Sequence, residues 1–266
     1  MKHQGVMKAS RSFDQAADFY DQTRPLFEAS VEAGVRSLLD AAGEEARILE
    51  VGAGTRRISI PLLERGADLV GCDLSGKMLS RQRVKHPPAR LVQSDAACLP
   101  FPSNHFEALL VVHVMHLIGP WKEALREFKR VLKPGGVFLN VSTYEPVGKS
   151  IRGEMRIHWR DWLKSQGVDT RHPGAQSDDE FRSELRSLGA LTKEVEVVRF
   201  SHVYNLRIEL DRYEARVFSN TRSVPEALYR ASLANLQNWV VQEYGDLDQE
   251  IEETYRFVFD AAYFDA

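Results

Sequence analysis

Short apolar runs alternate with amphipathic helical patterns from residue 47 onward. The apolar runs have the length and composition of buried strands, and they cover residues 47–51, 68–72, 89–93, 106–112 and 137–141. Helical spacing fills the intervals, at residues 58–65, at residues 75–85 and from Pro120 to the Lys133–Gly136 turn. Because strands and helices alternate with short connections, the pattern predicts a parallel sheet covered by helices on both faces.

The rhythm changes after Thr143, where helical segments separate two further strands. The strands are expected at residues 192–204 and 251–264, and the helices at 151–164 and after the capping-box residues Ser177 and Ser223. Helical insertions at about 145–190 and 206–248 therefore interrupt the sheet. Insertions near the carboxyl ends of strands commonly build the substrate pocket of an α/β fold, so we expect them to form a substrate cap.

Length and composition favour one soluble domain. The chain has 266 residues, 43% of them hydrophobic, and we expect an N-terminal helical lid at about 10–42 and a core at about 46–144. A net charge of −3 does not indicate a nucleic-acid or membrane surface, and no apolar run reaches the roughly 18 residues of a membrane span. The N-terminus lacks a signal-peptide pattern and the two cysteines form no CxxC motif, so the expected location is the cytoplasm. The oligomeric state stays open.

A glycine-containing loop, Glu50–Arg56, follows the first strand and opens a helix. Glycines let the backbone approach a ligand closely, and a helix N-terminus offers unpaired N–H groups. The fingerprint of nicotinamide enzymes needs glycine where this chain has Arg57, which argues against an oxidoreductase. Acidic residues end the next two strands, at Asp73 and Asp95. Together with Glu50 they point into one crevice, where a carboxylate can accept ribose hydroxyls.

The segments ILEVGAGT, VGCDLSGKML, SDAACLPFPSNHFEALL and LREFKRVLKPGGVF occur in this order. The combination resembles the class I methyltransferases that depend on S-adenosylmethionine (SAM), and among them the broad group that includes the ubiquinone/menaquinone-biosynthesis type. The resemblance covers about residues 13–143, including Phe13–Asp21, which is similar to the N-terminal helix of that group. It implies a Rossmann-like sheet of seven strands, the last one antiparallel, with helical insertions forming a lid. It also implies SAM as cofactor and S-adenosylhomocysteine as product.

The resemblance implies a set of cofactor-binding residues. In chain order they are Tyr20, Glu50, Gly52, Ala53, Gly54, Thr55, Asp73, Leu74, Met78, Asp95 and Ala96. The glycine loop would form the bed of the methionine moiety, and Asp73 would bind the ribose hydroxyls. Asp95, with the backbone of Ala96, would receive the adenine amino group, while Leu74 and Met78 pack against the adenine. Tyr20 would lie across the cofactor as part of a lid.

Two histidines follow the fourth strand. By resemblance, His113 falls near the reactive sulfonium and His116 lies on the following loop. His113 is therefore the first catalytic candidate, as a general base or as a group that orients the substrate. His116 is the second candidate. A hydrogen-bonded structural role is the alternative for both. No carboxylate pattern accompanies the pair, so a metal site is not expected.

Other side chains after the core receive plainer interpretations. Arg152, Arg156 and Arg160 repeat at helical spacing, which favours a solvated face over a site for an acidic substrate. Met155 and Trp159 are interpreted as apolar core. His202 and Tyr204, at the end of the sixth strand, are further candidates for the pocket lining.

The expected function is methyl transfer from SAM to a small-molecule acceptor, by O-, N- or C-methylation. One position departs from the group, which usually has glycine where this chain has Arg56. A cation at a helix N-terminus opposes the helix dipole by a few tenths of a kcal/mol. The alternative is therefore a SAM-binding protein that has lost methyl transfer, and that acts as a binding or regulatory module or catalyses another reaction.

Overall fold

The structure is a computed structural model that describes residues 28–43, 45–54, 59–85, 90–218, 220–221 and 223–265. Its elements are α1 (Glu28–Ala42), β1 (Arg47–Val51), α2 (Ser59–Glu64), β2 (Asp68–Asp73), α3 (Gly76–Lys85), β3 (Arg90–Gln93), β4 (Phe106–Val112), the 3-10 turn η1 (Met115–Leu117), α4 (Trp121–Val131), β5 (Leu132–Pro146), α5 (Ile151–Ser165), α6 (Asp178–Ser187), β6 (Ala190–Tyr204), α7 (Leu206–Glu214), α8 (Glu226–Tyr244) and β7 (Ile251–Phe264).

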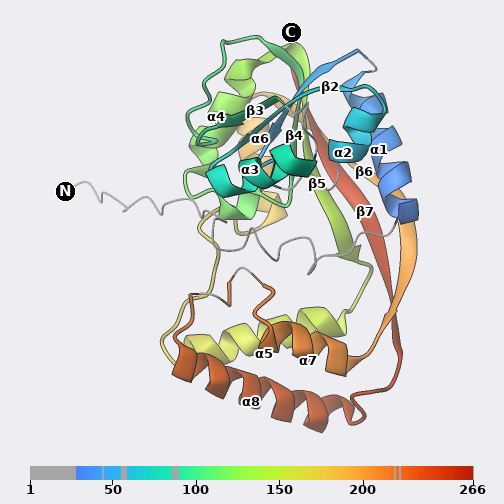
Figure 1. Cartoon of the computed structure of the whole chain (residues 1–266), viewed down its shortest axis with the longest axis vertical. Helices are drawn as coiled ribbons and strands as arrows, with labels where there is room; N and C mark the ends of the chain where they lie inside the picture. Colours follow the sequence, from blue (N-terminus) through green and yellow to red (C-terminus); the bar gives the residue numbers. More distant parts are fainter. Residues whose placement is uncertain are drawn as a thin grey trace, which may run out of the picture. The chain divides into compact units, whose positions relative to one another are not determined.

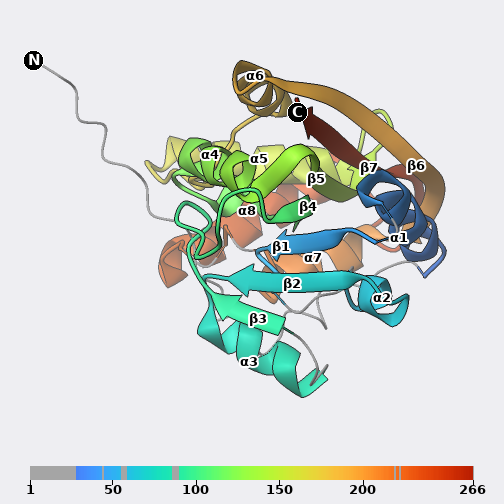
Figure 2. The same ribbon diagram turned by 90° about the horizontal axis from the view of Figure 1, so that it is seen from above.

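Among the described residues, one sheet has seven strands in the order β3-β2-β1-β4-β5-β7-β6. β1 pairs in parallel with β2 and β4, β2 with β3, and β4 with β5; Figure 2 shows β3, β2, β1 and β4 side by side. The expected Rossmann-like sheet with an antiparallel last strand is confirmed. The chain passes from β1 to β2 and β3 and returns on the other side of β1 as β4. This reversal places a switch point, where such folds bind ligands, at the carboxyl ends of β1 and β4.

Both faces of the central strands are buried, as expected for parallel strands. In β4, Leu109 and Val111 belong to one apolar cluster, whereas Ala108 and Leu110 belong to another. Residues of α4 and α6 complete the first cluster, and residues of α1 and α2 complete the second. The prediction of helices on both faces of the sheet is confirmed.

The start of β5 differs from the sequence pattern. The pattern predicts a turn at Lys133–Gly136 and a strand at 137–141, whereas β5 begins directly after α4, at Leu132. The register with β4 jumps between Phe106↔Leu132 and Ala108↔Val137, so the intervening residues form an irregularity within the pairing. A strand can thus begin before a glycine-rich segment and absorb it as a bulge, which local turn propensity does not indicate.

The chain divides into two compact units. The first unit draws its described residues from Met1–Tyr144, Pro173–Val198 and Phe257–Ala266, and the second from Glu145–His172 and Arg199–Arg256. α6 belongs to the first unit and contributes to the core of the sheet. The second unit contains α5, α7 and α8 (Figure 1).

The second unit has an apolar core of its own. Met155 and Trp159 are fully buried in it, as the sequence predicts. The indole N–H of Trp159 donates to Ser232 Oγ at 2.9 Å, which satisfies the polar atom of a buried ring.

One of the two expected helix caps is present. Ser177 Oγ accepts from the Glu180 N–H at 3.2 Å and caps α6. The prediction for Ser223 is wrong, because α8 begins after Pro225 and Ser223 donates instead to the Asn220 carbonyl at 3.4 Å. Proline lacks an N–H, so this helix start has one fewer donor to satisfy.

Candidate functional site

Backbone donors hold the glycine loop against the end of β2. The N–H groups of Gly52 and Ala53 both donate to the Cys72 carbonyl at 2.9 Å, and the Gly54 N–H donates to the Asp73 carboxylate at 2.8 Å. Burial raises the pKa of the Cys72 thiol to about 12, so this thiol stays protonated and unreactive. The loop is therefore shaped by main-chain atoms and one carboxylate.

Two constraints select glycine at position 52. Its φ is +73°, in the region that side chains disfavour, and an added Cβ would lie 2.7 Å from Val114 Cγ1. Gly54 has φ +49°, but its Cβ would make only an ordinary 3.8 Å contact with the Gly52 carbonyl oxygen. At position 54 the backbone conformation, rather than crowding, selects glycine.

Asp73 links three strand ends. One carboxylate oxygen accepts from Gly54, the other accepts from the Ser75 N–H at 2.7 Å, and the Asp73 carbonyl accepts from the Ser94 N–H after β3 at 3.1 Å. A carboxylate offers about four acceptor positions, so Asp73 can hold the loop and accept hydroxyl groups at the same time. Next to it, Leu74 is 36% exposed, whereas Met78 is buried.

Asp95 lies on a loop that residues of α4 hold by hydrogen bonds. Its carboxylate accepts from the Ala97 N–H at 3.0 Å. Further along the loop, the guanidinium of Arg130 donates to the Leu99 carbonyl at 3.0 Å, and Glu127 accepts from the Leu99 N–H at 2.9 Å. The neighbouring Arg130 also lowers the pKa of Glu127. These two α4 residues position the loop that carries Asp95 and Ala96.

Glu50 is a buried carboxylate in the middle of the sheet, 3% exposed and paired in register with Gly71 and Leu110. It accepts a hydrogen bond from the hydroxyl of Ser59, the first residue of α2. A buried carboxylate costs several kcal/mol unless it is hydrogen-bonded. Glu50 precedes the glycine loop and Ser59 follows it, so their hydrogen bond joins the two ends of the loop.

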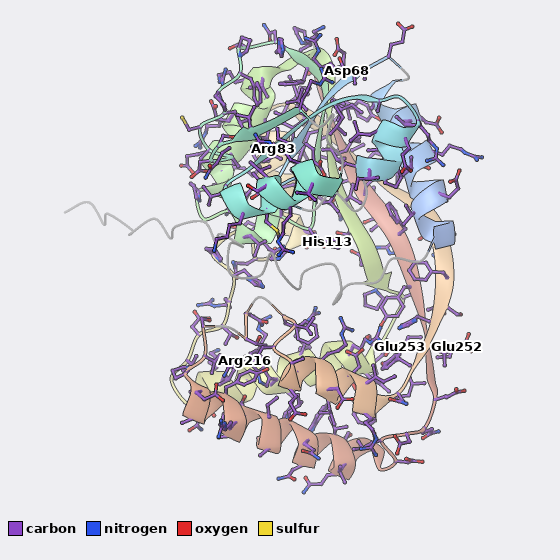
Figure 3. All side chains as sticks on the ribbon, viewed as in Figure 1. Asp68, Arg83, His113, Arg216, Glu252 and Glu253 are labelled. Carbon is purple, nitrogen blue, oxygen red and sulfur yellow. The ribbon has the colours of Figure 1, made fainter. Side chains whose placement is uncertain are left out.

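His113 leaves β4 in a left-handed conformation, with φ +53°. Few residues other than glycine adopt such a φ, and those that do cluster at functional sites. Its N–H donates to the Val141 carbonyl at 3.3 Å. Figure 3 shows His113 and Asp68, the first residue of β2, at opposite ends of the sheet. His113 therefore stands at the same edge as Asp73.

A pocket of about 250 Å³ opens at the carboxyl end of β4, beside residues 140–142 of β5 and within the first unit. Both His113 and His116 line it, together with Asn140 and Ser142 from β5 and the start of α6. The segment before α6 lies directly on η1. The Gly174 N–H donates to the His116 carbonyl at 2.9 Å, and a Cβ on Gly174 would come within 2.7 Å of that carbonyl carbon.

The structure thus gathers most of the candidate residues at one edge, while Tyr20, Thr55 and Arg56 lie outside the described residues. Sequence reasoning missed Asn140, Ser142, Ser59 and Asp178 as site residues. A signal existed for Asn140, which interrupts the apolar run of the fifth strand near its carboxyl end, where ligands bind in such folds. Asp178 was not identified as a pocket residue, because its sequence was interpreted only as the start of a helix.

The interpretation of Arg152 as a solvated residue is wrong. In the second unit its guanidinium pairs with Glu209 at 2.6 Å, donates to His202 Nε2 at 3.1 Å and lies 3.7 Å from the centre of the Tyr204 ring. Helical spacing cannot reveal this, because Glu209 comes from α7. Arg156 is exposed, as expected.

The contact with Arg152 also indicates which protonation state His202 has. Arginine is an obligatory donor, so His202 Nε2 is an acceptor here. Burial and the charge of Arg152 lower the pKa of His202. The ring is therefore neutral and its lone pair is engaged, which makes it a poor general base.

Two further features are not found among the described residues. None of these helices is long and apolar enough to cross a membrane. Nor do these residues include a group of three or more His, Cys, Asp or Glu side chains suited to holding a metal ion.

Comparison with known proteins points to one family for the core. Residues 49–140 match the family described as Methyltransferase domain. A demethylmenaquinone methyltransferase from Beutenbergia cavernae is 33% identical over 127 residues, which cover 47% of this chain and 53% of that protein. One from Renibacterium salmoninarum is 35% identical over 127 residues, covering 47% and 54%. The chain spans about half the length of the curated relatives it matches.

The solved structures extend the likeness of fold to most of the chain. The YcgJ protein from Bacillus subtilis superposes with a TM-score of 0.58 at 18% identity, covering 90% of this chain and 100% of that one. The sheet order, the ordered motifs and the family match together show that residues 49–140 belong to a methyltransferase domain with the class I fold.

Proposed function

We propose that the protein transfers the methyl group of SAM to a small-molecule acceptor. The main support is the bond between the glycine loop and Asp73, at the carboxyl ends of two adjacent parallel strands. This pair lies inside the segment that matches the methyltransferase domain. The demethylmenaquinone methyltransferases among its relatives support an enzymatic role.

The residues present suit SAM. The carboxylate of Asp73 would accept the ribose hydroxyls, and the half-exposed Leu74 offers apolar surface to the adenine. The loop from Gly52 to Gly54 carries no side chain larger than a methyl group, so the methionine moiety can approach its main chain. Asp95 and the backbone of Ala96 would receive the adenine amino group.

SAM supplies an electrophilic methyl group on a sulfonium, so the protein mainly has to orient the acceptor and exclude water. Transfer would join the methyl carbon to the acceptor atom and would leave the electron pair of the broken carbon–sulfur bond on sulfur. We assign the acceptor side to the pocket beside His113. His113 orients a hydroxyl acceptor and takes its proton, a role that typically contributes about 10²–10⁴-fold. His116 is the second candidate for this role.

Calorimetry tests the cofactor assignment. SAM and S-adenosylhomocysteine should bind the wild type, and Asp73→Asn should weaken binding at least tenfold, because it removes a charged acceptor worth about 1.5–3 kcal/mol. Asp68→Asn is the matched control, since Asp68 lies at the other end of β2. Binding that appears only in Arg56→Gly would mean that Arg56 closes the site. Failure of all these proteins to bind would exclude SAM as the cofactor.

A second candidate function is SAM binding without methyl transfer. The arginine at position 56 favours it. The cyclase SpnF shares the fold, with a TM-score of 0.53 at 17% identity over 92% of this chain and 86% of that one, and a shared fold does not fix a reaction. Tight SAM binding with no S-adenosylhomocysteine formed in a broad acceptor screen would favour this alternative.

A further inference from the structure

The pocket beside His113 has a chemical character of its own. We propose that it selects a compact acceptor that is neutral or cationic and that donates hydrogen bonds, with Asp178 as the residue that rejects anions. This inference rests on the proposed function and deepens it, because it names the class of acceptor.

Charge is the first observation. The described residues that line the pocket include Asp178, an exposed acidic residue at the start of α6, and two histidines, and they contain no lysine or arginine. A carboxylate or phosphate on the acceptor would meet a like charge at Asp178, and none of the described lining residues is a lysine or arginine that could offset it. Arg152, which the sequence offers as a partner for an acidic substrate, is already paired with Glu209.

The N-terminus of α6 does not reverse this preference. A helix start attracts anions through its unpaired N–H groups. In α6, however, Ser177 Oγ already accepts from the Glu180 N–H, and the first turn carries three acidic residues, Asp178, Asp179 and Glu180. The positive end of the helix is therefore compensated by its own residues.

Hydrogen-bonding capacity is the second observation. Asn140 and Ser142 lie two residues apart on β5, so their side chains share one face of the strand. Both are half-buried, and neither side chain has a hydrogen-bond partner among the described residues. Half-buried polar groups without partners gain most from a ligand that supplies them. The Asn140 carbonyl, the Ser142 hydroxyl and the Asp178 carboxylate all accept hydrogen bonds from hydroxyl or amine groups.

Size is the third observation. A volume of about 250 Å³ lies below the roughly 300–1,000 Å³ of pockets that hold drug-sized ligands. An added Cβ on Gly174 would clash with the main chain of η1, so the segment that leads into the lining residue Ala175 is tightly packed against η1. A single substituted ring or an equally compact molecule fits this space.

Two matched probes test the charge preference. Tyramine and 4-hydroxyphenylacetate share a phenol and differ mainly in the sign of their charge. Their affinities are measured by ligand-observed NMR with and without S-adenosylhomocysteine, for the wild type, for Asp178→Lys and for the control Asp179→Lys. The control changes the same helix turn at a residue outside the pocket lining, and thermal unfolding checks that both variants fold.

We expect the wild type to bind tyramine about fivefold more tightly than 4-hydroxyphenylacetate, Asp178→Lys to reverse this order, and Asp179→Lys to keep it. Asn140→Leu should weaken both probes about fivefold without changing their order. The inference would be overturned if the wild type bound the two probes equally or preferred 4-hydroxyphenylacetate. It would also be overturned if Asp179→Lys reversed the order of affinities as Asp178→Lys does, or if neither probe bound at millimolar concentration. Loss of S-adenosylhomocysteine binding would instead count against the proposed function, because the probe preference is also measured without it.

Discussion

The left-handed backbone of His113 can be separated from its side chain by comparing His113→Ala with His113→Gly. Both variants lack the imidazole, and they differ only in the Cβ atom. At φ +53° a Cβ costs about 1–2 kcal/mol, whereas glycine adopts this conformation freely. Glycine also loses about 0.5–1 kcal/mol more conformational entropy on folding. The glycine variant should therefore be more stable than the alanine variant by about 0.5–1 kcal/mol.

Urea unfolding of the two variants measures this difference directly. Asn140→Ala and Asn140→Gly form the control pair, because Asn140 lies in a strand and not among the residues with positive φ. There glycine should be the less stable variant by about 0.5–1 kcal/mol. If glycine destabilises position 113 as it does position 140, the assignment of backbone strain to His113 is wrong. Both His113 variants should lose methyl transfer to the same extent, since the strain is not the catalytic group.

Three further outcomes follow from contacts described above. Gly52→Ala should lower the free energy of unfolding by about 2 kcal/mol and weaken SAM binding in calorimetry, because it combines a positive φ with crowding against Val114. Arg130→Ala should lower the free energy of unfolding by about 1–2 kcal/mol, because it leaves loop carbonyls without a hydrogen-bond donor. It should also raise deuterium exchange at residues 95–101, and unchanged exchange would show that Arg130 does not hold this loop. Burial and Arg152 lower the pKa of His202 below its ordinary 6.5, with Arg212 also opposing protonation and Glu209 and Glu253 favouring it. The unfolded chain thus binds the proton more readily, so stability is complete above pH 6.5 and falls as the pH drops through the lower folded pKa. Thermal unfolding between pH 8 and pH 5 should show this slope, and His202→Gln should flatten it.

The central sheet could be predicted because buried parallel strands leave continuous apolar runs. β1 and β4 begin and end where the runs do. The helix α6 shows the limit of such patterns. Its apolar positions Phe181 and Leu185 indicate a buried face, but periodicity does not say which element covers it, and in the structure they join the sheet core. The sequence places insertions at about 145–190 and 206–248, near the segments of the second unit, but it does not indicate that α6 belongs to the first unit.

The site divides in the same way. The cofactor side could be predicted because Gly52 and Asp73 belong to short ordered motifs, and their roles as SAM contacts stay predictions that calorimetry can test. On the pocket side the sequence indicated His113 and His116 but not Ser142 and Asp178, which line the same pocket only because of the fold. Nor does the sequence indicate the positive φ of His113, which depends on how β4 meets η1.

The way the glycine loop is held has a consequence for how this protein can change over evolutionary time. Gly52, Ala53 and Gly54 are fixed by their own N–H groups to a backbone carbonyl and to Asp73. None of these bonds depends on which side chains stand at positions 55–57. The hydrogen bonds that hold residues 52–54 therefore do not by themselves select the residue at position 56.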